Sequence, residues 1–225
     1  LMSIIFNESK YNLILKGNFY NQTSIIDINI MLDLLPELLI VLFIFYNLIN
    51  LFNNKTKVIF QYYKWIYYFI ILLFVLGLKL ILLNSRMPEI IFGFSWLNSY
   101  YVLISKIIIL LLTICILYIS QNKIKYFLKL NYFIEFPLII GFSVLFMFIL
   151  LSSYDFFGVY LAIEGLSLTL YVLSALLHQG IISIEAGIKY FSLGAIASGS
   201  LLLGISILFG LIGSLDFLEI QNFLG

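Results

Sequence analysis

The sequence has very few charged residues. They make up 10% of its 225 residues, whereas 63% are hydrophobic. A soluble domain usually has about 25% charged residues, so this chain has too little polar surface to cover a water-soluble globule of its size. A soluble protein with a large core is therefore the minor alternative, and a membrane protein is expected. The formal net charge of +1 and the absence of a basic stripe argue against nucleic-acid binding.

Cysteine and histidine are almost absent as well. Cys115 is the only cysteine and lies inside an apolar run, so it forms no intrachain disulfide and says nothing about the redox compartment. With His178 as its only histidine, the chain lacks the usual ligand sets for zinc, haem and iron–sulfur clusters. It also has no nucleotide-binding loop or flavin fingerprint. We therefore expect no cofactor in this chain, and any redox chemistry to occur elsewhere.

Arginine and proline are scarce too. Arg86 is the only arginine and there are three prolines, while the 22 phenylalanines and 16 tyrosines accompany many isoleucines, asparagines and lysines. These abundant residues have AT-rich codons, which indicates an organellar gene. Residues 1–30 are polar and of mixed charge, unlike a signal peptide or an arginine-rich transit sequence. A protein made inside an organelle needs neither.

Long apolar runs are what the sequence does contain. Each is long enough to cross about 30 Å of hydrocarbon at about 1.5 Å per residue. We expect helices, because an isolated strand cannot satisfy its backbone in lipid. The expected fold class is thus an all-α, polytopic transmembrane helix bundle, with a polar extension at 1–33 and a short outer-side tail at 214–225. The six expected spans are 34–52, 65–83, 102–120, 133–153, 156–177 and 186–212.

Basic residues alternate between the loops. The loops after the first, third and fifth spans contain them, whereas the loop after the second has only Arg86 and the loop after the fourth has none. The positive-inside rule then places the three basic loops on the inner side and both chain ends on the outer side. Lys10 and Lys16 argue against this orientation. The basic residues of the inner loops are Lys55, Lys57, Lys64, Lys123, Lys125, Lys129 and His178, followed by Lys189.

Three charged residues near span ends have an ordinary explanation. Lys79 and Lys106 lie about one turn inside their spans, so we expect both to extend their ammonium groups to the membrane surface. Glu135 precedes Pro137 at a helix start, where a carboxylate favours the helix dipole.

Glu164 has no such explanation, because it lies deep within the stretch "YLAIEGLSLTLYVLSALL". A glutamate side chain cannot reach a span end about 12 Å away. It must face protein or water, be protonated, or pair with a base. Tyr160, Ser167 and Tyr171 form a polar stripe with it on one side of the helix. A neutral glutamate that only holds helices together is the structural alternative.

A second group of charges begins the last span. Glu185 and Lys189 are spaced for a helical ion pair, with Lys189 just inside the inner membrane edge. Antiparallel packing places Lys189 about 12 Å from Glu164 along the membrane normal. Such a lysine would switch the proton affinity of a buried glutamate, which predicts a proton relay. His178 is expected to be a loop residue, with a role at an inner proton entry as the alternative. A stripe of small residues should serve helix packing: Gly194, Ala195, Ser198, Gly199, Ser200 and Gly204.

The same stretches resemble a known family. "YLAIEGLSLTLYVLSALL" followed by "SIEAGIKYFSLGAIASGSLLLGISILFGLIGSLDF" is similar to subunit 2 of mitochondrial NADH dehydrogenase (respiratory complex I), called chain N in bacteria. The shared pattern is E-x-x-S-L-x-L-Y followed by E-A-x-x-K-Y-F, and the resemblance covers about 154–217. Related antiporter-like subunits 4 and 5 typically have a proline where this chain has "GLSLTLY". Residues 1–150 match only in hydropathy.

The resemblance implies a proton-translocating membrane-arm subunit of the mitochondrial inner membrane, with its N-terminus facing the intermembrane space. Glu164 would be the membrane glutamate that pairs with a lysine on the family's seventh helix, and Glu185 and Lys189 would match the charged pair that starts the sixth. FMN, iron–sulfur clusters and ubiquinone would belong to other subunits.

The family has about twice as many helices, so its seventh-helix lysine lies beyond this sequence. We therefore expect a truncated or split subunit, with a second polypeptide that supplies the lysine as its partner. A cation/proton antiporter subunit and a purely structural scaffold subunit are the alternatives.

Overall fold

The computed structural model of the chain describes residues 34–53, 64–72, 74–76, 89–91, 96–127, 135–176 and 181–224. The chain divides into two units, 1–35 and 36–225. All that follows concerns the second unit. The expected polar extension at 1–33 lies outside the described residues.

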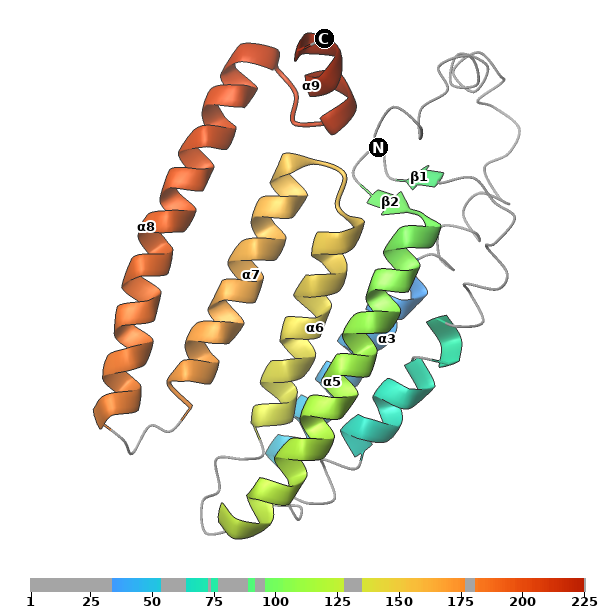
Figure 1. Ribbon diagram of the computed structural model, residues 1–225, viewed down its shortest axis with the longest axis vertical. Coiled ribbons are helices and arrows are strands. Elements are labelled where there is room, and N and C mark those ends of the chain that lie inside the picture. The colour runs from blue at the N-terminus through green and yellow to red at the C-terminus, as the bar shows by residue number, and fades with distance from the viewer. Residues whose placement is uncertain are drawn as a thin grey trace. The chain divides into compact units, whose positions relative to one another are not determined.

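The described residues are mainly helical, and the expected helix bundle is confirmed (Figure 1). Residues 64–72 and 74–76 are helical as well. A short antiparallel hairpin pairs Glu89 with Asn98 and Ile91 with Trp96, which the sequence pattern did not predict. The remaining elements are α3 (Leu35–Asn53), β1 (Glu89–Ile91), β2 (Trp96–Asn98), α5 (Tyr100–Phe127), α6 (Phe136–Ser152), α7 (Phe156–Ser174), α8 (Ile181–Ile212) and α9 (Phe217–Leu224).

The helix bounds differ from the expected spans mainly at two ends. α5 continues to Phe127, beyond the expected end at residue 120, and α8 begins at Ile181 instead of residue 186. Among the described residues, three helices are long and apolar enough to cross a membrane: Tyr100–Ser120 within α5, α7, and α8. Shorter apolar helices cover Leu35–Ile49, Lys64–Leu76 and Phe136–Ser152. By length and composition, these helices fit the expected multi-pass membrane protein.

Four helices form a row. Figure 1 shows α5, α6, α7 and α8 side by side in chain order, and each packs against its neighbour in the row. The bundle's buried core lies at one end of this row, where α3, the helical residues 64–72 and 74–76, α5 and α6 meet. Its largest fully buried side chains include Trp65, Phe69 and Phe148. In contrast, α7 buries only Ala162 and Gly165 fully, and α8 only Gly187 and Ile205.

Small residues let the row pack closely at two contacts. A methyl group added at Gly165 of α7 would overlap the ring of Phe146 on α6. A methyl group added at Gly187 of α8 would come within 2.7 Å of the Ala175 side chain at the end of α7. Glycine at these two positions thus allows α6 and α8 to approach α7 closely.

The Gly165 contact gives the first prediction. Gly165→Ala should force α6 and α7 apart and destabilise the fold by about 1–3 kcal/mol, the usual range for overpacking. Gly199→Ala is the matched control, because nothing lies within 4 Å of the added methyl group and alanine is favoured over glycine in a helix by about 1 kcal/mol. Thermal unfolding of the purified protein in detergent measures both. Equal unfolding temperatures for the two variants would contradict the described α6–α7 contact.

Candidate functional site

Glu164 lies on α7 and is half-buried. Its carboxylate oxygen Oε2 is buried and has no hydrogen-bond partner among the described residues. The next residue, Gly165, packs against Phe146 of α6, so apolar groups adjoin the site on that side. A buried polar atom without a partner costs about 1–3 kcal/mol. We therefore expect Glu164 Oε2 to bind a proton, or to contact a hydrogen-bond donor or a cation outside the described residues.

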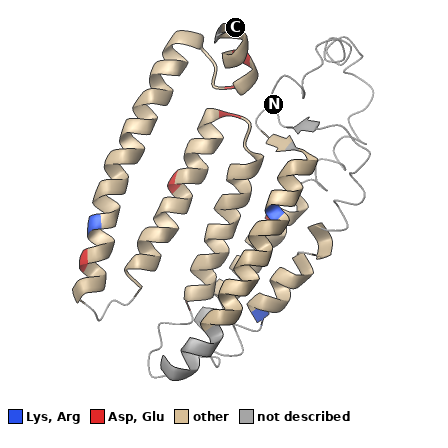
Figure 2. Cartoon of the chain, viewed as in Figure 1, with Lys and Arg blue, Asp and Glu red and all other residues tan. Residues whose placement is uncertain are grey.

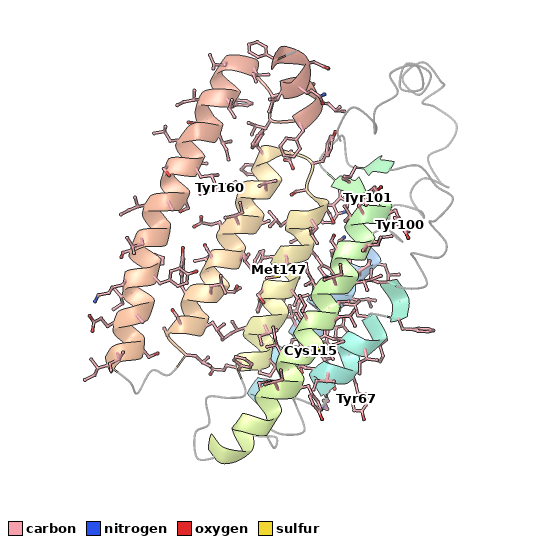
Figure 3. All side chains as sticks on the ribbon, in the orientation of Figure 1. Tyr67, Tyr100, Tyr101, Cys115, Met147 and Tyr160 are labelled. Atoms are coloured by element: carbon pink, nitrogen blue, oxygen red, sulfur yellow. The ribbon has the colours of Figure 1, made fainter. Side chains whose placement is uncertain are left out.

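The neighbours expected to support Glu164 make other contacts. The Ser167 hydroxyl donates to the backbone carbonyl of Glu164 at 2.8 Å, not to its carboxylate. The ring of Tyr171 packs against Tyr190 at 4.9 Å and against Phe191 at 5.6 Å, both on α8. Tyr171 thus joins α7 to α8, and the Ser167 hydroxyl hydrogen-bonds within its own helix. Tyr160, one turn before Glu164, is labelled on α7 in Figure 3.

Glu185 and Lys189 form the expected helical ion pair, with Lys189 Nζ 2.5 Å from Glu185 Oε1. The pair is exposed, because 71% of the lysine side chain and 58% of the glutamate side chain remain accessible. Among the described residues, Lys189 pairs only with Glu185, and Glu164 forms no ion pair. His178 and Lys79 lie outside the described residues. Glu164 and Lys189 are thus separate charges on neighbouring helices, without direct contact.

The small residues of α8 face a partner over only part of their length. Gly194 lies against the hydroxyl end of Tyr171, so a side chain there would overlap it. An added methyl group at Gly199 or Gly204 would meet nothing within 4 Å. Large apolar side chains along α8 are also exposed, including Ile196 at 73% and Leu203 at 61%. Figure 3 shows side chains projecting from α8 to both sides in this view.

A second charge pair, this one buried, was missed by the sequence analysis. Lys106 of α5 was expected to extend to the membrane surface, but its ammonium group lies 2.5 Å from Glu37 Oε1 of α3. Both residues are buried, with Lys106 3% and Glu37 7% exposed. The snorkelling expectation for Lys106 was wrong because it considered one helix alone, while the partner comes from another. Figure 2 shows how few charged residues the helices of this bundle contain.

A signal for this pair did exist in the sequence. Glu37 follows Pro36 in the first turn of α3, and Lys106 lies within the first two turns of α5. Alternate spans of a membrane bundle start on the same side, so two opposite charges near the starts of the first and third spans can meet. Searching for such complementary depths across spans would have paired them.

The connections beside α7 gather acidic residues. Asp155, just before α7, forms a backbone bridge with Asp216, just before α9. Burial, together with the nearby Glu219 and Asp155 carboxylates, raises the pKa of Asp216 above its usual value. The rings of Tyr154 and Phe156 pack against Phe217 at 5.6 and 4.7 Å. This contact ties the start of α7 to the start of α9. Within the described residues no group of metal-ligating side chains forms.

Comparisons with known proteins agree with the sequence pattern. Residues 153–225 match the family model described as the transmembrane part of NADH:quinone oxidoreductase and the Mrp antiporter. This range contains Glu164, Glu185 and Lys189. Subunit N of NADH-quinone oxidoreductase from Ruthia magnifica is 34% identical over 180 residues, which cover 78% of this chain and 35% of that protein.

Two solved structures share the fold. A chain of respiratory complex I from Thermus thermophilus, solved with bound aureothin, is 22% identical, with a TM-score of 0.62, and the match covers 80% of this chain and 38% of that one. A chain of the membrane-bound sulfane sulfur reductase, an archaeal respiratory membrane complex, is 16% identical, with a TM-score of 0.61, and the match covers 84% of this chain and 38% of that one.

The resemblance to subunit N, expected from the sequence, is confirmed. The chain spans about a third of the length of the curated relative from Ruthia magnifica. The Glu164 region lies inside the matched range and the Glu37–Lys106 pair lies outside the range of the family model. Only the first of the two charged sites is therefore covered by that model.

Proposed function

We propose that this relative of subunit N of NADH-quinone oxidoreductase is a non-redox, membrane-arm subunit of respiratory complex I, and that it contributes to proton translocation. One observation carries the proposal: a glutamate within the matched range has a buried carboxylate oxygen without a partner. Ionisable residues inside a membrane are rare and functional by default. Proton transfer is the chemistry that a carboxylate can perform there without a metal or cofactor.

Each of the described residues near Glu164 has a proposed role in this proton transfer. Glu164 takes up a proton at Oε2, which becomes a neutral carboxylic acid, and releases it to restore the carboxylate. Phe146 and Gly165 keep one side of the site apolar, which favours the neutral form until a positive charge approaches. Lys189, paired with Glu185 on the adjoining helix, supplies a positive charge whose movement changes the proton affinity of Glu164.

The remaining partner of Glu164 is proposed to lie outside residues 1–225. The part of the relatives beyond the matched third, whether it continues this polypeptide or belongs to a second one, would bring the lysine that pairs with Glu164. Other membrane-arm subunits would complete the assembly, with FMN, iron–sulfur clusters and ubiquinone bound elsewhere in the complex. We propose that the protein lies in the mitochondrial inner membrane, with its N-terminus facing the intermembrane space. The support is the abundance of residues with AT-rich codons and the charges of the loops.

A cation/proton antiporter subunit is the second candidate function, because the description of the matched family model includes the Mrp antiporter. The curated relative is a subunit of NADH-quinone oxidoreductase, which favours the first. A scaffold without proton traffic is the third, and would make the buried oxygen of Glu164 a packing defect. Sodium-dependent transport by the purified assembly would favour the antiporter.

Gentle purification tests membership of the complex. An affinity-tagged copy of the chain, extracted in a mild detergent, should elute with other membrane-arm subunits and with inhibitor-sensitive NADH:quinone oxidoreductase activity. A tagged copy of an unrelated multi-pass protein from the same membrane is the control. Elution of the chain with neither the activity nor those subunits would contradict the proposal.

A further inference from the structure

The Glu37–Lys106 pair occupies a closed site built by four elements. Glu37 comes from α3 and Lys106 from α5, while Trp96 of β2 and Phe148 of α6 face the ammonium group with their rings. The distances from Lys106 Nζ to the two ring centroids are 5.8 and 5.5 Å. Aromatic faces attract a cation electrostatically, most strongly where water is excluded. Two aromatic rings and one carboxylate oxygen thus lie around the ammonium group.

Stability alone does not explain charges at this place. Removing two charges from water is costly, and well-packed apolar residues of similar size usually serve a buried contact equally well or better. The surroundings of the pair are suited to such residues, since Phe148 and Leu103 are fully buried beside it in the apolar core. A charge pair in such a core points to a use of the charge itself.

The second carboxylate oxygen indicates that use. Glu37 Oε1 accepts the hydrogen bond from Lys106, whereas Oε2 is buried and has no hydrogen-bond partner among the described residues. Glu164 Oε2 is in the same condition. Glu37 and Glu164 thus each have a buried carboxylate oxygen that can accept a proton. They lie on different helices, and only Glu164 is within the matched range.

We propose that Glu37 is a second intramembrane proton-binding group, with Lys106 as its electrostatic partner, and that it takes part in proton translocation. The proton bonds to Oε2 and leaves a neutral carboxylic acid; its release restores the carboxylate, and no electron is transferred. From β2 and α6 the pair is faced by the aromatic rings of Trp96 and Phe148, and Lys106 supplies the positive charge. The inference rests on the proposed function, since it adds a second step to the same proton traffic.

A paired substitution separates a proton-binding role from a clamp between helices. Glu37→Leu combined with Lys106→Met removes both charges and leaves an apolar contact of similar size, so the complex should assemble to the wild-type amount. The number of protons moved per NADH oxidised, measured in proteoliposomes, should nevertheless fall below the wild-type value. A wild-type proton number in the assembled double variant would overturn the inference and make the pair a clamp only.

A second measurement covers a double variant that fails to assemble. Glu37→Asp keeps a carboxyl group at the site, and infrared difference spectra during turnover should show a shifted carboxylic acid band relative to wild type. Identical spectra would overturn the inference.

Glu164→Gln in the same proton assay distinguishes the two proposals. If Glu164→Gln lowers the proton number and the Glu37 variants do not, only the further inference fails. If Glu164→Gln pumps as wild type does, the proposed function itself fails.

Discussion

Replacing Glu164 by glutamine is expected to stop most of the proton movement through this subunit while the complex still assembles. Glutamine has nearly the same shape, and the described contacts of the site involve Gly165 and the backbone carbonyl of residue 164, which the substitution leaves in place. An amide cannot bind and release a proton at this position, and a positioned acid–base group speeds proton transfer about 10²–10⁴-fold. Proton uptake and NADH oxidation in proteoliposomes measure the loss.

Glu219→Gln is the matched control for this experiment. Glu219 lies on α9 and is exposed, so the same chemical change there should leave both proton movement and assembly as in wild type. A Glu164→Gln complex that assembles and moves protons at the wild-type rate would contradict the relay and favour the scaffold. A variant that fails to assemble would show that the amide is not tolerated in the fold, and Glu164→Asp would then be compared.

Replacing Lys106 by methionine is expected to produce a large loss of stability. Methionine fills the space between Trp96 and Phe148, but Glu37 then loses its cationic partner in a buried site. Breaking a buried ion pair from one side costs about 3–5 kcal/mol, because the other charge stays uncompensated. The amount of assembled complex and its thermal unfolding in detergent measure this loss.

Lys189→Met is the matched control, since it also breaks a lysine–glutamate pair at 2.5 Å, but one with the lysine side chain 71% exposed instead of 4%. Exposed pairs contribute about 0–1 kcal/mol, so its unfolding temperature should change little. Adding Glu37→Leu to Lys106→Met should recover most of the lost stability. Equal effects of the two lysine substitutions would show that the Glu37–Lys106 contact is not buried in the assembled protein.

Hydrophobicity and charge were sufficient to predict the helix bundle but not its contacts. The expected span that contains Glu164 begins at Phe156, as α7 does. A helix could be predicted there because lipid leaves the backbone no alternative. Lys106 was misjudged because a single span does not reveal which charges lie on the helices packed against it. The hairpin at Glu89 and Trp96 was missed because its strands are only three residues long.

The candidate site was found from the sequence for a related reason. Glu164 lies too far from either end of its helix to reach water, so depth alone singled it out. The roles of Ser167 and Tyr171 did not follow from their spacing, because spacing on a helix does not tell whether a hydroxyl donates to a carboxylate or to a backbone carbonyl. Glu37 was missed because its position in a first turn is ordinary for an acid, and only its contact with Lys106 makes it unusual.

The central claim is the proposal that Glu164 is one half of a charge pair whose lysine lies outside residues 1–225. An experimental structure of the assembled complex that resolves waters near Glu164 tests it most directly. The account predicts a lysine ammonium group within about 6 Å of the Glu164 carboxylate, or joined to it by one water molecule. A Glu164 carboxylate surrounded only by apolar groups, with no lysine of any chain at that distance, would contradict it.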